Sequence, residues 1–340
     1  MCLKHYSKML CFMMFKFFVC VYPSFLNNIF REKKMNYHFL NYIETMLPKD
    51  LLRHIFGFFE ENELLRLRKV CKYFKKNANL QVLYYLKITT ENKYLLEFNP
   101  KIFRNLIFLD CHYNELTKIP HISSLKKLNC SENKLIEIPH IVGLKELNCS
   151  YNHILKIPNI IGLKKLWCHF NDIKKIPNIK GLVELNCSYN RLTEIPHIIG
   201  LRKLYCTNNQ LTKIPHIYEL ERLHCFNNKL TEIPYIEGLR FLHCSNNQLT
   251  EIPNIYGLIE LYCNDNLLKK IPNITELKEL WCSRNQITEI PNINKLKKLW
   301  CSNNLLTEIP HIIGLEELCC YGNMLEKIPQ IKNCKIYYLH

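Results

Sequence analysis

Apolar and polar positions in the C-terminal two-thirds of the chain repeat every nineteen residues. One unit reads Leu125-x-x-Leu128-x-Cys130-x-x-Asn133-x-Leu135-x-x-Ile138-Pro139-x-Ile141. The same columns recur in twelve consecutive units between residues 106 and 331. A unit this short cannot bury its own apolar face, so the units are expected to stack into a solenoid with one continuous core.

Each unit is expected to add one short strand to a parallel sheet. Leu128 and Cys130 are two positions apart and point inward on an extended segment, whereas Asn129 between them points outward. The Ile-Pro-x-Ile segment is expected to be extended, because proline fixes φ and lacks an N–H. Nineteen residues leave little room for a helix on the return side.

These columns resemble the leucine-rich-repeat pattern L-x-x-L-x-L-x-x-N-x-L, with cysteine at the third apolar position. The resemblance covers about two-thirds of the chain. It implies an α+β repeat protein: a leucine-rich-repeat solenoid of short coils, with a parallel β-sheet on its concave face. The asparagine column is expected to use its amides to satisfy backbone groups at a buried turn.

The cysteines, eighteen in all, fall mostly in one column of the repeat. Neighbouring coils bring cysteines within disulfide range, but their parallel Cβ vectors make poor disulfide geometry. Zinc needs four convergent ligands, which an inward-facing column does not supply. We therefore interpret this column as small buried apolar residues with free thiols, which are typical of a reducing compartment. No metal and no cofactor are expected.

One outward column of the expected strands is rich in aromatic residues. It holds all three tryptophans of the chain, and six consecutive units from Tyr205 to Trp300 place an aromatic residue or a histidine there. This favours a binding surface, because Trp and Tyr are enriched at interface hot spots. The alternative is a ladder of rings that only stabilises the sheet. The candidate partner-binding residues of the concave face are Trp167, Tyr205, His224, His243, Tyr262, Trp281, Trp300, Phe170, Tyr189 and Phe226.

The formal net charge of +16 is concentrated in the first third of the chain. Residues 1–105 carry 18 Lys and Arg against 8 Asp and Glu, whereas residues 106–331 carry 26 against 22. Nucleic-acid binding requires a surface of one sign, so nucleic acid is not the expected partner of this mixed surface. Single-stranded RNA stays a minor alternative, because bases stack on aromatic rings. His224 and His243 lack the further ligands of a metal site.

Apolar residues between positions 47 and 76 have the spacing of three short helices, with a polar break at residues 60–62. This stretch resembles an F-box. Leu47, Pro48 and Asp50 match the start of that pattern, and Val70-Cys71 lies in its closing segment. The apolar residues that would contact an adaptor are Leu47, Pro48, Leu51, Ile55, Phe59, Leu64, Leu67, Val70, Cys71 and Phe74.

The F-box resemblance implies docking on the Skp-type adaptor of a cullin–RING (SCF-type) ubiquitin ligase in the cytoplasm. The repeats would then bind a protein substrate whose identity the sequence does not reveal. The alternative is a helical cap that closes the first coil of a plain protein-binding scaffold. No serine–histidine or paired-carboxylate arrangement predicts an active site, so the chain is expected not to be an enzyme.

Five segments are expected along the chain. They are a leader at 1–34, disordered or weakly helical, an F-box-like helical module at 35–86, an N-terminal cap at 87–105, the solenoid at 106–331 and a C-terminal cap at 332–340. The apolar stretch at residues 9–22 suggests a signal peptide, but no small-residue cleavage site follows. It is also too short to span a membrane, so no membrane association is expected, and Met35 is an alternative start. In the C-terminal cap, Cys334, Tyr337 and Leu339 are expected to continue the apolar register, with Leu339 in the cysteine column.

Overall fold

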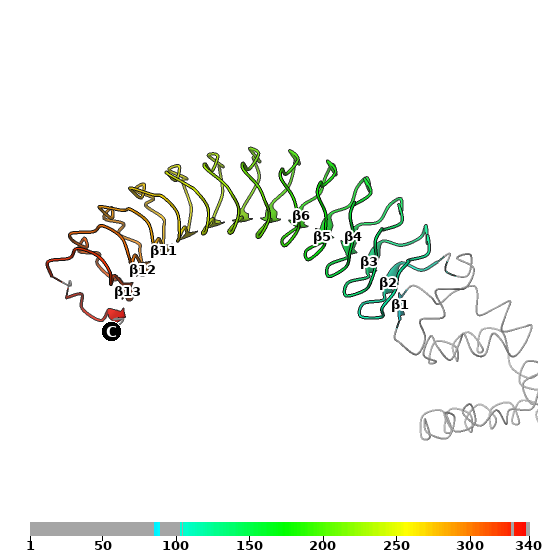
Figure 1. Ribbon diagram of the computed structural model, residues 1–340, viewed down its shortest axis with the longest axis horizontal. Coiled ribbons are helices and arrows are strands. Elements are labelled where there is room, and N and C mark those ends of the chain that lie inside the picture. The colour runs from blue at the N-terminus through cyan, green and yellow to red at the C-terminus, as the bar shows by residue number, and fades with distance from the viewer. Residues whose placement is uncertain (1–84, 89–102, 104, 328–329, 338–340) are drawn as a thin grey trace, which may run out of the picture. The chain divides into compact units, whose positions relative to one another are not determined.

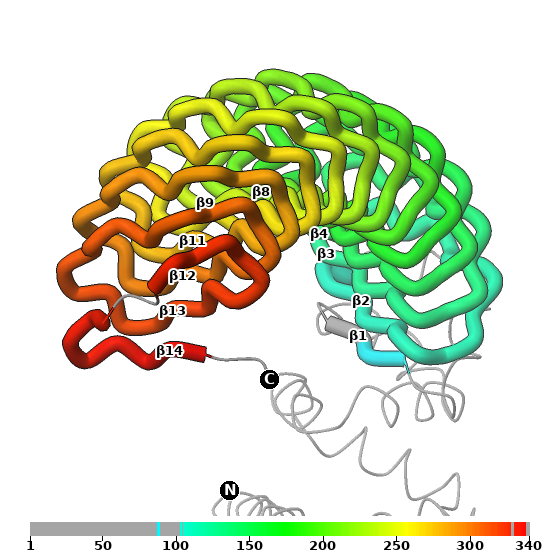
Figure 2. Tube along the Cα trace, turned by 60° about the vertical axis from the view of Figure 1, so that its left-hand side comes forward, coloured from blue at the N-terminus to red at the C-terminus, as the bar shows by residue number. Residues whose placement is uncertain are grey.

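The computed structural model describes residues 85–88, 103, 105–327 and 330–337. In these residues fourteen three-residue strands form one parallel sheet in sequence order. The coils stack along an arc with the strands on its inner, concave edge (Figure 1), and Figure 2 shows the same coil path repeated along the solenoid. The strands are β1 Tyr85–Lys87, β2 Phe108–Asp110, β3 Lys127–Asn129, β4 Glu146–Asn148, β5 Lys165–Trp167, β6 Glu184–Asn186, β7 Lys203–Tyr205, β8 Arg222–His224, β9 Phe241–His243, β10 Glu260–Tyr262, β11 Glu279–Trp281, β12 Lys298–Trp300, β13 Glu317–Cys319 and β14 Lys335–Tyr337.

The prediction of a solenoid with about twelve short coils is confirmed by the pairing of β2 to β13. Equivalent residues nineteen positions apart lie opposite each other, such as Leu128 with Leu147 and Leu147 with Leu166. The middle residue of each of these strands is buried. No α-helix occurs among residues 105–327, because the return side of each coil is short and extended.

The core consists of the same six columns in each coil between the first and the last. Leu125, Leu128 and Cys130 are buried in the unit that served as the example, as are the leucine and two isoleucines that follow. Burying one leucine or isoleucine side chain contributes about 1.5–3 kcal/mol. Stacking of neighbouring coils therefore supplies the stability that a single coil lacks.

The asparagine column forms a ladder of amide hydrogen bonds along the core. Asn152 Nδ2 donates to the carbonyl oxygens of Cys130, Cys149 and Ser150 at 3.0, 3.1 and 3.0 Å. Its Oδ1 accepts the backbone N–H of Leu135 at 2.9 Å. The following coils repeat the arrangement, so the predicted role of this column is confirmed.

The cysteine column is buried and its thiols are free in the described coils. Desolvation raises the pKa of thiols such as Cys168 and Cys206 well above the usual range. A buried thiol that stays protonated is a poor nucleophile. These cysteines therefore act as packing residues, as their position in the repeat predicts.

We expect the thiols of this column to resist alkylation in the folded protein. At about pH 8, where an exposed cysteine reacts readily, iodoacetamide should leave Cys168 and Cys206 unmodified, and urea should make both reactive. Peptide mapping by mass spectrometry measures this, and the half-buried Cys334 provides an accessible comparison. Native modification of Cys168 at the rate of Cys334 would contradict the assignment.

The sheet continues past the twelve coils at both ends. At the N-terminal end β1 pairs with β2, so that Lys87 lies opposite Asp110, and the sheet crosses the expected boundary at residues 86/87. Ile88 and Phe103 are buried beside the first coil. The chain divides at residues 84/85 into two units, and residues 1–84, with the expected leader and most of the F-box-like module, lie outside the described residues.

The expected register of the C-terminal cap is wrong by one residue. The turn at Cys334 repeats the turn at Leu315, and these two residues are nineteen positions apart. In the strands, however, Cys319 pairs with Tyr337, which is only eighteen positions later in the sequence. The residue missing from this coil lies between the turn and the strand. Ile336 rather than Tyr337 therefore lies opposite the core residue Leu318.

Candidate protein-binding surface on the concave face

A continuous row of rings runs along the concave side of β7 to β12 and ends on β14. We name it the aromatic strip. Its first four ring-to-ring centroid distances are 4.9, 5.7, 5.3 and 5.4 Å. Trp281 and Trp300 stack face to face at 4.5 Å with 5° between their planes, and Trp300 contacts Tyr337 at 5.1 Å. The strip consists of Tyr205, His224, His243, Tyr262, Trp281, Trp300 and Tyr337.

The in-register parallel sheet produces this row. Neighbouring strands lie about 4.8 Å apart, so side chains of one outward column stand next to each other. Each ring of β7 to β12 is half-buried by its neighbours and half-exposed on the concave side. The predicted ring ladder is therefore present, and the same rings form an apolar surface that faces solvent.

Carboxylates of the neighbouring column hold several of these rings in place. The Tyr262 hydroxyl donates to Glu279 at 3.0 Å, and the Tyr337 hydroxyl donates to Glu317 at 3.3 Å. The stacked pair differs, because the buried indole N–H groups of Trp281 and Trp300 have no partner among the described residues. Rings that are already ordered lose less conformational entropy when a partner binds.

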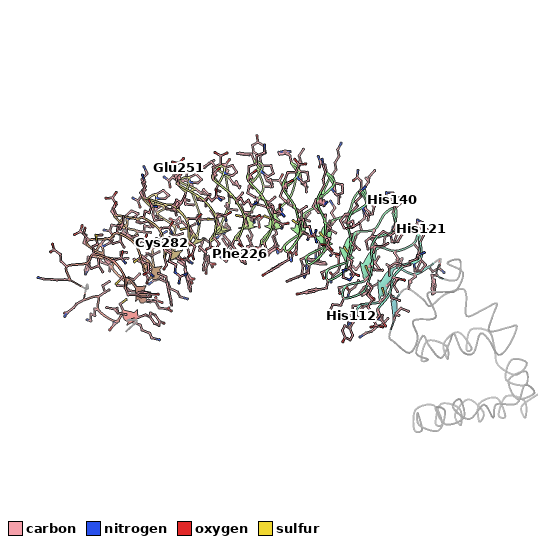
Figure 3. The ribbon with its side chains drawn as sticks, in the orientation of Figure 1. His112, His121, His140, Phe226, Glu251 and Cys282 are labelled. Atoms are coloured by element: carbon pink, nitrogen blue, oxygen red, sulfur yellow. The ribbon has the colours of Figure 1, made fainter. Side chains whose placement is uncertain are left out.

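The remaining predicted residues lie in three places. Phe226 stacks on His243 at 4.5 Å and widens the strip on the inner side of the arc (Figure 3). Trp167 stands apart from the strip, between Asn148 and Asn186, and its indole N–H donates to Glu184 at 3.0 Å. Phe170 and Tyr189 lie on the turns that follow the strands.

These turns carry a second aromatic group, the stacked rim of Tyr151, Phe170 and Tyr189. The ring centroids are 4.4 and 4.0 Å apart, with interplanar angles of 12° and 10°. All three residues have φ of 52–53°, in the left-handed region. The equivalent residues of later coils include Asn208 and Asn227, whose side chains tolerate this region better. Here stacking offsets the strain, and the three rings are exposed beside the concave face.

The first outward residue of most strands is charged, and the sign changes along the sheet. Lys127 lies 3.2 Å from Glu146, and Glu279 lies 3.2 Å from Lys298. The concave face is therefore mixed in charge, as the composition of the repeats predicts.

Two aromatic residues in or beside the strip were not among the predicted ones, Tyr337 and Phe241. Tyr337 joins the strip only because the last coil is one residue short. Phe241 occupies a column that is charged in the neighbouring strands β7, β8 and β10, and it points outward beside His243. An aromatic residue in this mostly charged column was the available signal.

Two histidines of the strip are held in their neutral forms. The pKa of His224 is lowered to about 4 by burial, with smaller contributions from His243 and Arg222. Burial also lowers the pKa of His243. Neutral imidazoles extend the largely uncharged surface between Tyr205 and Tyr262.

Lowering the pH from about 7 to about 5 is expected to destabilise the solenoid through His224. An unfolded histidine titrates near pH 6.5, so the unfolded chain takes up a proton that the folded chain does not. The stabilisation that comes from keeping His224 neutral is complete above about pH 6.5. It is lost as the pH falls toward the pKa of His224 in the folded protein. Urea midpoints should fall further for the wild type than for His224→Phe, and equal falls would contradict this role.

No group of three or more His, Cys, Asp or Glu side chains that could hold a metal ion is found among the described residues. In the same part of the chain, no helix has the length and apolar character needed to cross a membrane.

Two family models match the sequence. Residues 275–314 match the model described as leucine-rich repeats in two copies, and residues 45–86 match the F-box-like model. No curated protein matches the sequence. The matched repeats include the stacked pair Trp281 and Trp300.

Solved leucine-rich-repeat structures share the fold. A leucine-rich-repeat protein of Leptospira interrogans is 25% identical with a TM-score of 0.64, over 71% of this chain and 74% of that one. The leucine-rich effector YopM of Yersinia pestis is 28% identical with a TM-score of 0.61, over 69% and 77%. Their coverage agrees with a solenoid that occupies about two-thirds of the sequence. The chain is a leucine-rich-repeat protein with an F-box-like domain at residues 45–86.

Proposed function

We propose that this protein is the substrate-recognition subunit of an SCF-type cullin–RING ubiquitin ligase. Its F-box-like domain docks on a Skp-type adaptor, which connects it to the cullin, and its solenoid binds a protein substrate. The observation that carries the binding role is the aromatic strip, an ordered and half-exposed row of rings on a concave surface. The match at residues 45–86 supports the adaptor role.

The chemistry of the concave face favours a protein as its partner. Aromatic side chains with fixed rotamers are typical of interface hot spots. The charged residues beside the strip carry both signs, as in the Lys203–Glu184 and Lys298–Glu279 pairs, which suits the mixed charge of a protein surface better than a polyanion. The solenoid therefore acts by binding, and the chemistry of ubiquitin transfer belongs to other subunits.

The cytoplasm is the compartment that suits this function. F-box proteins act inside the cell, where the ligase components are present. The free thiols of the cysteine column agree with a reducing environment.

A plain scaffold with a helical cap is the second candidate. The F-box-like match ends at residue 86, inside β1, so the matched segment continues directly into the sheet. A cap has the same continuity with the first coil of a solenoid. Deleting residues 35–80 separates the two roles. Removing a cap would expose the first coil and cause unfolding or aggregation, whereas a solenoid that stays folded after the deletion would count against the cap.

Affinity purification of the full chain with mass spectrometry tests the ligase role. The wild type is expected to recover a Skp-type adaptor and a cullin, and the triple variant Leu47→Ala, Pro48→Ala, Ile55→Ala is expected to lose both. The solenoid of that variant should still bind its substrate, because the substitutions lie outside the repeats.

The reciprocal variant is the control. Trp281→Ala with Trp300→Ala should keep the adaptor at the wild-type level and lose the substrate. Recovery of no adaptor with the wild type, or the same recovery with the triple variant, would leave the plain scaffold as the better description.

A further inference from the structure

One positive charge in the middle of the concave face has no carboxylate partner among the residues that the structure describes. Arg222, the first residue of β8, places its guanidinium over the ring of Phe241 with 3.8 Å from Cζ to the ring centroid. Among the described residues, no carboxylate oxygen lies within 4.0 Å of this guanidinium. The contact with Phe241 fixes its position and leaves its N–H donors available.

The other cations of this column between β3 and β12 are paired. Lys127 and Lys165 lie 3.2 and 3.9 Å from Glu146, and Lys298 lies 3.2 Å from Glu279. Lys203, beside Arg222, reaches Glu184 at 4.0 Å. Arg222 differs because the next strand, β9, has Phe241 where an acidic residue would complete the pair.

Two imidazoles stand beside this guanidinium. His224 follows it on β8, and the rings of His224 and His243 are 5.7 Å apart. Phe226 covers one side of His243. No hydrogen bond joins either imidazole to another residue in the described part of the chain. The cluster therefore offers guanidinium and imidazole N–H donors on an aromatic floor.

We infer that Arg222, with His224 and His243, binds an anionic side chain of the partner protein. The inference rests on the proposed function, in which the concave face holds the substrate. A guanidinium binds a carboxylate or a phosphate through two parallel hydrogen bonds, and both groups fit this cluster. The aromatic floor excludes water and strengthens such a bond.

The charged and titratable groups that face the cluster carry both signs. Lys203 and Tyr205 face it from β7, and Glu260 and Tyr262 face it from β10. The Glu260 carboxylate accepts a hydrogen bond from Tyr262 at 3.5 Å and lies more than 4.0 Å from any described cationic nitrogen. A bound anion would favour the protonated imidazoles, so the pKa of His224 rises on binding.

The distance from this cluster to the stacked tryptophans gives the spacing of the ligand. β8 and β11 are three strand steps, or about 14 Å, apart. An extended peptide covers this distance with about four residues. The anionic residue of the partner therefore lies about four residues from an apolar residue that contacts Trp281 and Trp300.

A titration of the full chain with small anions tests the cluster directly. The histidines are labelled with ¹³C and ¹⁵N, and inorganic phosphate and N-acetylglutamate are the probes. Saturable shifts of the His224 and His243 resonances are expected, and Arg222→Gln should weaken phosphate binding about tenfold or more. Arg202→Gln is the matched control, because Arg202 lies outside the strand and is paired with Glu221 at 3.1 Å. Absent shifts, or equal affinity in Arg222→Gln and the wild type, would overturn the inference.

A peptide library identifies the source of the anion. Its members carry Glu, phosphoserine or Gln at one position and an apolar residue four positions away, and a uridine decamer is added as a nucleic-acid probe. Preference for Glu or for phosphoserine, lost in Arg222→Gln, supports the inference and names the source. Equal binding of the Gln peptides would overturn it, as would tighter binding of the RNA than of any peptide.

The outcomes separate this inference from the proposed function. Peptide binding that needs Trp281 and Trp300 but shows no anionic preference removes the anion site and leaves substrate binding intact. Anion binding that needs Arg222, without recovery of a Skp-type adaptor, keeps the site and removes the ligase role.

Discussion

Replacing Trp281 and Trp300 together with alanine is expected to weaken binding of the protein partner by about 100-fold or more. The two indoles stack face to face at 4.5 Å and are the largest side chains of the aromatic strip. Removing both leaves a gap between Tyr262 and Tyr337, which contact the outer sides of the pair. The folded solenoid should change little in stability, because the core leucines below the pair are unchanged. Binding is measured by titration calorimetry and stability by thermal unfolding.

The double variant Tyr218→Ala, Tyr256→Ala is the matched control. Both tyrosines are exposed, at 70% and 74%, on turns outside the strands. Their loss should leave partner affinity within about twofold of the wild type, as is usual away from a hot spot. If the tryptophan variant binds as tightly as this control, the strip stabilises the sheet only and the partner binds elsewhere.

Replacing Asn152 with alanine is expected to destabilise the solenoid by about 3 kcal/mol or more. The substitution removes four hydrogen bonds at once and leaves three carbonyl oxygens and the Leu135 N–H to find other partners. Asn152 is buried, so water does not readily replace the lost amide. The free energy of unfolding, measured with urea, shows the loss.

Asn178 provides the control for this substitution. It is an asparagine of the exposed column that follows the prolines, and its replacement by alanine should change the free energy of unfolding by less than about 0.5 kcal/mol. A similar loss in the two variants would mean that the buried amide ladder is not a main source of stability.

The concave face changes character along its length, which bears on how a partner binds. In its first part the outward column is polar apart from Trp167, and Asn129 donates to Asp110 at 2.9 Å. From Tyr205 to Trp300 the same column holds aromatic residues and histidines whose rings are in contact. The strongest contacts of the proposed substrate are therefore expected on the C-terminal half of the solenoid.

The nineteen-residue spacing by itself determined the sheet, the core columns, the inward cysteines and the asparagine ladder. Each of these follows from local rules. Alternation on a strand places Leu128 and Cys130 on one side, and the exact repeat places equivalent residues of successive coils next to each other. The same spacing also predicts that the rings from Tyr205 to Trp300 lie in one row. It also placed the mixed charges beside them.

Only the tertiary structure decided which side chains lie together where the repeat is irregular. A coil one residue short brings Tyr337 to Trp300, and a left-handed turn moves Phe170 and Tyr189 from the strip to a separate rim. Arg222 has no carboxylate partner among the described residues because Phe241 stands opposite it on the next strand. These outcomes depend on turn geometry and on contacts between coils, and a pattern read within one unit contains neither.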